Sequence, residues 1–221
     1  MLRIVVVAGL VSTRREYDHL FNVYVPIAIG VFAVIASSVL VAVLVYRRRP
    51  PERAARWHER NSIEGTYAVL LACTAAFLLY LTFTTEHRVD TVANQQRPAV
   101  VVEVTASKWE WTFTYPDYGF SVRSGTVGRQ PLVVPAGEPV RFNLTSLDVI
   151  HSFWIPALRY KHDAISGSTQ VTTLSFSPGV FSGQCAEFCG LRHADMVFTA
   201  HAVSPAAFTA WARSQGRGPT P

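Results

Sequence analysis

Four side chains that commonly bind soft or borderline metal ions lie close together near the C-terminal end of the chain. In the segment GQCAEFCGLRHADM (183–196), Cys185, Cys189, His193 and Met196 follow one another at intervals of four, four and three residues. Thiolate, imidazole and thioether ligands favour copper, whereas calcium and magnesium prefer oxygen. A blue single-copper site uses one cysteine, so the two cysteines here could instead bridge two copper ions.

A second histidine ligand has to come from elsewhere in the chain. His151, in the segment DVIHSFW, follows a predicted strand at 139–146 and is the natural candidate. Two alternatives are a disulfide between the cysteines in an oxidising compartment and a zinc site. A disulfide explains neither His193 nor Met196, and methionine is an unusual zinc ligand. The residue types therefore favour copper.

Two uncharged segments near the N-terminus are long enough to cross a membrane. Residues 21–46 and 66–85 each exceed or match the roughly 20 apolar residues that a spanning helix needs. The alternative for each segment is a buried core helix. The loop 47–65 between them carries six arginines, which predicts a cytoplasmic loop and places both chain termini on the extracytoplasmic side. Residues 1–20 are predicted to be a short N-terminal segment.

The position of the basic residues also bears on possible partners. The chain has a formal net charge of +5, and much of this excess lies in the arginine-rich loop beside the apolar segments. This location indicates membrane topology and not a phosphate-binding face, so we expect no nucleic-acid partner.

The rest of the chain is predicted to form an all-β domain over residues 98–213, after a linker at 86–97 and before a loose tail at 214–221. Apolar and polar side chains alternate strictly along KWEWTFTY (108–115), with Trp109 and Trp111 on one face. Residues 131–134 and 139–146 flank the turn PAGEP and predict a hairpin. Further strands are predicted at 99–104, 170–176 and 196–203, and a short helix from Ser204 to Arg213. Short strands separated by Gly and Pro indicate a Greek-key barrel or sandwich.

The metal-binding segment resembles the motif C-x-E-x-C-x3-H-x2-M of cytochrome c oxidase subunit II, a family with two N-terminal membrane helices and a cupredoxin domain that holds a dinuclear copper centre, CuA. The resemblance also covers the aromatic stretch at 108–115, the D-x-x-H segment and the stretch K-x-D-A-I-x-G at 161–167. Ser166 and Ser168 stand where Pro and Arg are common in the family. This departure affects the contacts with subunit I that the resemblance implies, and it does not affect the copper site.

The resemblance implies a ligand set for the two copper ions. Cys185 and Cys189 would bridge them, and His151 and His193 would each bind one. Met196 and the backbone carbonyl of Glu187 would be the weak axial ligands. The carboxylate of Glu187 would bind magnesium at the border with subunit I.

Three further residues receive roles from the resemblance, and each has a simpler alternative. Trp109 would accept electrons from the donor, although strand alternation alone predicts a core aromatic. Asp148 would help to dock a basic cytochrome c, which predicts salt-sensitive association, or is a turn residue. Glu64 would lie at the mouth of a proton pathway in subunit I, or is an acidic residue favoured at a helix N-terminus. The surrounding IEGTY departs from the usual family pattern.

The function implied is electron transfer in a proton-translocating oxidase of the bacterial cytoplasmic membrane. Electrons would pass from cytochrome c or a c-type haem domain, through CuA, to haem in subunit I, where oxygen is reduced and where all haem resides. Partners would be subunit I and other oxidase subunits. The alternatives are the CuA subunit of a nitric oxide or nitrous oxide reductase, a metal-free quinol oxidase subunit, and a copper chaperone or storage protein. No C-x-x-C-H occurs, so no fused c-type haem domain is expected.

Overall fold

The computed structural model describes residues 13–47 and 60–215. Most of the arginine-rich loop, the start of the N-terminal segment and most of the predicted tail lie outside these described residues. The chain divides into a helical unit, residues 17–87, and a second unit that contains all the described strands.

Two helices, α1 (Thr13–Val41) and α2 (Asn61–Gln95), contain the two apolar segments, and α1 continues as a short π-helix, Ala42–Tyr46. Both are long and apolar enough to cross a membrane, and almost none of their apolar surface is buried within the described chain. The hydroxyl of Tyr24 in α1 donates a hydrogen bond to the carbonyl of Leu78 in α2, at 2.8 Å. The helical part of the predicted fold is therefore confirmed.

The helices extend beyond the predicted spans. Because α1 begins at Thr13, it takes in part of the predicted N-terminal segment, and Pro26 lies well inside the helix. The α2 helix includes most of the segment predicted as a linker, residues 86–97. The predicted spans were the uncharged segments alone, so they ended at the first charged residue on each side. A helix can continue past such an apolar segment, because its backbone hydrogen bonds form within the helix itself.

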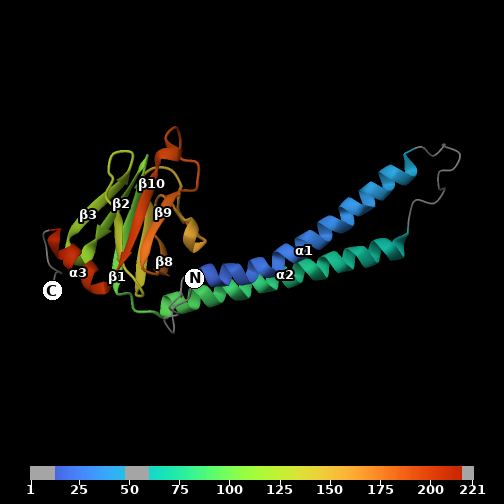
Figure 1. Ribbon diagram of the computed structural model, residues 1–221, viewed down its shortest axis with the longest axis horizontal. Helices are drawn as coiled ribbons and strands as arrows, with labels where there is room; N and C mark the ends of the chain where they lie inside the picture. The colour runs from blue at the N-terminus through green and yellow to red at the C-terminus, as the bar shows by residue number, and fades with distance from the viewer. Residues whose placement is uncertain (1–12, 48–59, 216–221) are drawn as a thin grey trace. The chain divides into compact units, whose positions relative to one another are not determined.

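The second unit is a sandwich of two five-stranded sheets (Figure 1). The first sheet has the order β3-β2-β1-β5-β8, and the second has the order β4-β10-β9-β6-β7. The strands of the first sheet are β1 (Val100–Ser107), β2 (Glu110–Tyr115), β3 (Phe120–Gly125), β5 (Pro139–Ser146) and β8 (Gln170–Ser175). Those of the second are β4 (Leu132–Pro135), β6 (His151–Ile155), β7 (Tyr160–Ala164), β9 (Gly179–Cys185) and β10 (Val197–Val203). Pairs β1–β5 and β4–β10 are parallel, and the other pairs are antiparallel.

The inner faces of the two sheets form an aromatic core. Trp111 and Phe113 of β2 are fully buried, as the alternation of the sequence predicted. They contact Phe153 of β6 and Phe198 of β10 edge to face, and the rings of Phe153 and Phe198 stack at 4.8 Å. Aromatic pairs of this kind add stability beyond their burial of apolar surface. Phe153 and Phe198 thereby anchor the second sheet, in which β6 and β9 are neighbouring interior strands.

The predicted hairpin of residues 131–134 and 139–146 is wrong, because β4 and β5 belong to different sheets. The turn between them binds both sheets. Ala136 donates its amide to the carbonyl of Val203 in the second sheet, and Gly137 donates to the carbonyl of Phe176, directly after β8 of the first. Gly137 has a φ of +76°, which suits glycine. A three-residue connection of this kind resembles a hairpin in sequence, although it crosses from one sheet to the other.

The predicted strand at 108–115 begins later in the structure. Ser107 pairs with Glu110, so Lys108 and Trp109 form the two-residue turn between β1 and β2. Trp109 is half-buried and lies outside the strand, which corrects its placement on the core face with Trp111.

The C-terminal helix α3 (Pro205–Ser214) begins as predicted. The hydroxyl of Ser204 accepts a hydrogen bond from the amide of Ala207 at 3.3 Å, and Pro205 takes the first helical position. The buried side chain of Phe208 packs beside Tyr115 of β2. The helix therefore covers the end of the sandwich where β2 and β4 meet.

Tyr115 provides a test of this packing. Its buried hydroxyl donates to the carbonyl of Val133 at 2.8 Å and accepts from the amide of the same residue at 3.0 Å. Replacing Tyr115 with Phe should lower the free energy of unfolding of the β domain by about 2 kcal/mol, because two buried backbone groups lose their partner. Urea denaturation followed by tryptophan fluorescence measures the change. Tyr118→Phe is the matched control, because the Tyr118 ring packs on Phe208 and its hydroxyl makes no hydrogen bond among the described residues. An equal loss in both variants would contradict the role of the Tyr115 hydroxyl.

Candidate metal centre

Strand ends and one loop bring the predicted metal ligands together. His151 is the first residue of β6 and Cys185 is the last of β9, and these strands are neighbours, with Phe153 opposite Cys185. Cys189 lies in the following loop, His193 begins a short 3-10 helix, and Met196 directly precedes β10. We call residues 186–195 the ligand loop. The chain thus supplies all five side chains from one end of the second sheet.

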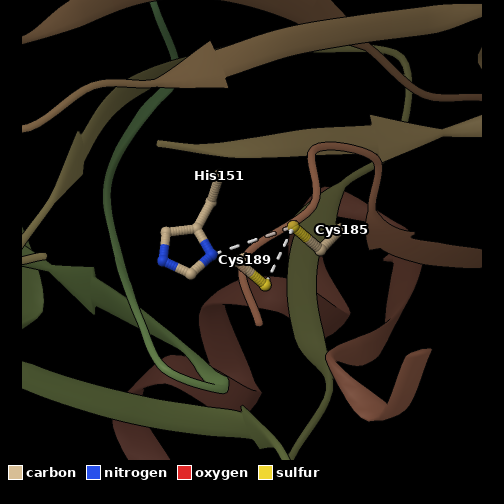
Figure 2. A group of neighbouring side chains, drawn as sticks. All are labelled: His151, Cys185 and Cys189. Carbon is tan, nitrogen blue, oxygen red and sulfur yellow. Dashed lines mark hydrogen bonds between the residues drawn. The ribbon is translucent and has the colours of Figure 1, made fainter. Parts of the chain in front are cut away.

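The donor atoms of these side chains converge on one point. Figure 2 shows His151, Cys185 and Cys189 directed toward one another, and their donor atoms lie within 4.8 Å of each other. The Sγ atom of Cys185 is 3.8 Å from Nδ1 of His151 and 3.9 Å from Sγ of Cys189. The Sγ atom of Cys189 is also 3.5 Å from Nδ1 of His193 and 3.9 Å from Sδ of Met196. The two cysteines are free thiols.

Backbone hydrogen bonds hold the ligand loop in place. Cys185 donates its amide to the carbonyl of Met196 at 3.0 Å, and Ala186 donates to the carbonyl of Ser152 at 2.9 Å. Gly190, within the loop, has a φ of +115°, a conformation that other residues adopt only with strain. His151, Cys185, Cys189 and Met196 are buried, with exposed fractions between 0 and 4%. Backbone hydrogen bonds therefore hold the ligand loop, and these four donors are shielded from water, whereas His193 is half-buried.

Asp148 orients His151. Its Oδ1 atom is 2.8 Å from Nε2 of His151, so Nε2 carries the proton and Nδ1 remains directed at the sulfur atoms. The other carboxylate oxygen accepts a hydrogen bond from the amide of Lys108 at 2.8 Å. Burial opposes ionisation of Asp148, but these hydrogen bonds outweigh it and lower the pKa of the carboxyl group. A carboxylate behind a ligating imidazole is a common arrangement in metal sites.

The two thiols differ in acidity. Burial alone would raise the pKa of Cys185, but hydrogen bonding with His151 and with the backbone lowers it to about 7. Burial and the nearby Cys185 thiolate raise the pKa of Cys189. Without a cation one thiol therefore ionises readily and its neighbour keeps its proton. A metal ion that binds both sulfur atoms must displace that proton.

Two tryptophans contact the backbone of the metal-binding residues. The indole nitrogen of Trp109 donates to the carbonyl of Cys189 at 3.2 Å, and the indole nitrogen of Trp111 donates to the carbonyl of Met196 at 3.3 Å. The ring of Trp111 also lies edge-on to His151, at 6.2 Å between centroids. From the sequence alone, Trp111 is predicted only to be a core residue. Its position two residues after Trp109 is the only feature of the sequence that could have indicated a contact with the metal-binding residues. That position does not distinguish such a contact from simple packing in the core.

The two glutamates singled out from the sequence lie in different surroundings. The carbonyl oxygen of Glu187 is 3.2 Å from Sγ of Cys185, and its side chain is exposed. Glu64 lies in the first turn of α2, in the helical unit, where its carboxylate accepts a hydrogen bond from the amide of Arg60 at 3.3 Å. This contact agrees with the simpler interpretation of Glu64 as a helix N-terminal residue.

We expect Asp148→Asn to lower copper affinity by about 10- to 100-fold, because a neutral amide supports the imidazole of His151 less well than a carboxylate does. Competition with a copper chelator measures the affinity. Asp163→Asn is the matched control, since this carboxylate pairs with the exposed Lys161 at 3.5 Å and makes no hydrogen bond to a predicted ligand among the described residues. If Asp148 acted only in docking, its substitution would leave copper affinity unchanged and slow reduction by cytochrome c.

The chemistry of the donor set fits copper. Two thiols, two imidazole nitrogens and one thioether, all soft or borderline donors, surround one buried point, and no carboxylate oxygen takes part among the described residues. The fold and the site together define a class: a β-sandwich domain with a ligand cluster that suits copper, preceded by two apolar helices.

Comparisons with known proteins define the family. Residues 125–203 match the family model of the periplasmic domain of cytochrome c oxidase subunit II. The periplasmic domain of subunit II of cytochrome oxidase (CoxB) of Bradyrhizobium japonicum is 31% identical, with a TM-score of 0.51 over 54% of this chain and 94% of that domain. The chain belongs to the cytochrome c oxidase subunit II family, and its β domain is cupredoxin-like, as the sequence predicted.

Full-length relatives are matched over part of their length. Cytochrome c oxidase subunit 2 of Alkalihalophilus pseudofirmus is 33% identical over 88% of this chain and 57% of the relative. Ubiquinol oxidase subunit 2 of Acetobacter aceti is 32% identical over 84% of this chain and 66% of the relative. With its two apolar helices and a domain related to a periplasmic one, the chain is a membrane protein with an extracytoplasmic domain.

Proposed function

We propose that the chain is the electron-transfer subunit of a haem–copper terminal oxidase, which accepts electrons from a cytochrome c at a dinuclear copper centre. The observation that carries this proposal is the convergence of two cysteine thiols, two histidine nitrogens and one methionine sulfur on one buried point. The family membership supports it, since the relatives are named as oxidase subunits.

Each ligand has a role in this proposal. Cys185 and Cys189 would supply thiolates to two copper ions, and His151 and His193 would each supply one imidazole nitrogen. Met196 and the carbonyl of Glu187 would be weaker ligands. When bound, the copper pair supplies a one-electron carrier whose charge is shared over both metals.

The protein's own contribution is to keep this donor set fixed. The hydrogen bonds of the ligand loop, the burial of the ligands and the contact of Asp148 with His151 all limit movement of the donors. Ligands that scarcely move when the charge of a site changes favour fast electron transfer, because little structure has to rearrange. Trp109 extends from the β1–β2 turn to the backbone of Cys189 and is the proposed point at which electrons reach the centre.

Further parts of the proposal concern the complex. Electrons leave toward haem in subunit I, which holds all the haem of this pathway and reduces oxygen in a proton-translocating reaction. The exposed carboxylate of Glu187 binds magnesium at the border with subunit I, and other oxidase subunits complete the assembly. The chain lies in a bacterial cytoplasmic membrane with both termini on the extracytoplasmic side. The proton-pathway role of Glu64 stays a prediction.

A metal-free quinol oxidase subunit is the second candidate, because the Acetobacter aceti relative is named a ubiquinol oxidase subunit. The complete donor set argues against it, since a chain that binds no metal has no need of five converging ligands. The dinuclear centre of a nitric oxide or nitrous oxide reductase would use the same ligands, and the two apolar helices favour the oxidase over the nitrous oxide enzyme.

Metal analysis combined with electron paramagnetic resonance tests the proposal. We expect two copper ions per chain and one unpaired electron that couples equally to two copper nuclei. Reduced cytochrome c should bleach the optical absorption of this centre. One copper per chain, zinc, or no bound metal would contradict the proposal, and the last result would favour the quinol oxidase alternative.

A further inference from the structure

Trp111 reaches the metal centre from the sheet that supplies none of its ligands. It is the second residue of β2 in the first sheet, whereas His151, Cys185 and Met196 lie at strand ends of the second sheet. The side chain of Trp111 points into the interior of the sandwich and is fully buried. The proposed ligands therefore have a fixed neighbour on the opposite sheet, which does not depend on the ligand loop.

Trp111 is attached to the metal centre at the carbonyl of Met196. This oxygen accepts two hydrogen bonds, one from the amide of Cys185 at 3.0 Å and one from the indole nitrogen of Trp111 at 3.3 Å. The amide of Met196 donates to the carbonyl of His193 at 3.3 Å. Because Met196 precedes β10, these few bonds fix its backbone. They thereby also fix the place of its sulfur atom, which lies 3.9 Å from Sγ of Cys189.

The core holds the indole of Trp111 in one orientation. Its ring lies edge-on to the imidazole of His151, with 6.2 Å between the centroids and an angle of 66° between the planes. Phe153 and Phe198 contact the indole at 5.7 Å and 5.9 Å between centroids. These two residues belong to β6 and β10, the strands that begin at or directly after His151 and Met196. A ring enclosed in this way cannot tilt without displacing its neighbours, so the hydrogen bond to Met196 keeps one geometry.

We propose that Trp111 is a positioning residue of the copper centre: its indole N–H holds the backbone of Met196 and thereby sets how strongly the thioether binds copper. This inference rests on the proposed function. The weak axial ligand and the hydrogen bonds around a copper–thiolate site tune its reduction potential. Without the indole bond the carbonyl of Met196 is free to turn away from the first sheet, and the thioether moves with it. Trp111 therefore contributes to the reduction potential and to copper affinity, and not only to packing.

Trp111→Phe in the whole copper-loaded chain in detergent tests the proposal, because phenylalanine keeps a buried aromatic ring and removes the N–H. We expect the equilibrium constant for one-electron reduction of the centre to change by at least about threefold, equal to about 28 mV in a redox titration. In the electron paramagnetic resonance spectrum, coupling to the two copper nuclei should become unequal, because Met196 is proposed to bind only one of them. Competition with a chelator should show a copper dissociation constant about tenfold higher.

Phe113→Leu is the matched control for packing. Phe113 lies on the same face of β2 as Trp111 and contacts the same two rings, Phe153 and Phe198, but its ring pairs with no ligand residue among the described residues. This substitution should lower the urea midpoint of unfolding, since it leaves a cavity in the core. It should leave the reduction potential and the resonance spectrum unchanged. An equal shift of potential in both variants would mean that Trp111 acts only by packing, and would overturn the proposal.

A double substitution shows whether Trp111 acts through Met196. In the Met196→Leu chain the thioether is absent, so Trp111→Phe has no axial sulfur left to displace. Adding Trp111→Phe to that chain should therefore change the reduction potential by less than half as much as it does in the native chain. The same change in both chains would contradict the proposal.

A tryptophan analogue provides a second test if Trp111→Phe does not fold. Site-specific incorporation of 3-benzothienylalanine in place of Trp111 exchanges the indole N–H for sulfur and nearly preserves the shape of the ring. The same shifts are expected, and an unchanged potential and spectrum would overturn the inference. The native chain separates this failure from that of the proposed function. If it binds two copper ions that share one electron, only the inference fails, whereas a native chain without such a centre contradicts the proposed function.

Discussion

Replacing Cys185 with serine is expected to eliminate the dinuclear copper centre. The Sγ atom of this residue lies beside Nδ1 of His151, Sγ of Cys189 and the carbonyl of Glu187, so it is the donor that joins the two halves of the site. A serine hydroxyl is a harder donor that stays protonated at neutral pH and cannot bridge two copper ions as a thiolate does. Copper content should fall from two ions per chain to one or none, and the signal of an electron shared by two nuclei should disappear.

Two control variants show whether the loss of copper is specific to Cys185. Cys73→Ser removes the third cysteine, which is exposed on α2 and belongs to the helical unit, and should leave copper content unchanged. Met196→Leu keeps a buried apolar side chain in place of a weak axial ligand, so we expect copper to be retained with a shifted reduction potential. If Met196→Leu lost all copper while Cys185→Ser lost none, the proposed ligand roles would be wrong.

Replacing Trp109 with phenylalanine is expected to slow reduction of the centre by cytochrome c by about tenfold or more, equal to at least about 1.4 kcal/mol in activation free energy. The indole is half-buried in the β1–β2 turn and donates to the carbonyl of Cys189, which links the surface directly to a ligand residue. Phenylalanine lacks the indole nitrogen and cannot make this bond. The copper spectrum and cytochrome binding should change little. Stopped-flow absorption spectroscopy measures the rate.

The alternative role for Trp109 is a packing residue, and one variant distinguishes the two. Under that role Trp109→Phe would lower the free energy of unfolding by about 1–3 kcal/mol and leave the rate of electron transfer unchanged. Trp211→Phe is the matched control, because Trp211 is also half-buried against the core but lies on α3 beside Tyr115 and Phe120. A normal reduction rate in Trp109→Phe with a lowered melting temperature would remove the electron-accepting role.

Short-range patterns in the sequence determined much of this protein. The spacing of Cys185, Cys189, His193 and Met196 identified the ligand loop, because ligands within twelve residues are brought close by the loop itself. The alternation from Trp111 to Tyr115 predicted the buried face of β2, since successive side chains of a strand point to opposite faces. The two uncharged segments predicted the helices, and Ser204 with Pro205 predicted the start of α3.

Long-range contacts decided the rest. The residue types made His151 a candidate, but its contact with Cys185, 34 residues away, depends on the pairing of β6 with β9. Trp109 and Cys189, 80 residues apart, meet only because the two sheets pack face to face. The same packing placed β4 and β5 in different sheets. It also brought Asp148 within hydrogen-bonding distance of His151 and of the amide of Lys108. Local periodicity is set by neighbouring residues, whereas strand pairing depends on which faces the whole domain can bury together, and that choice is made only in the tertiary structure.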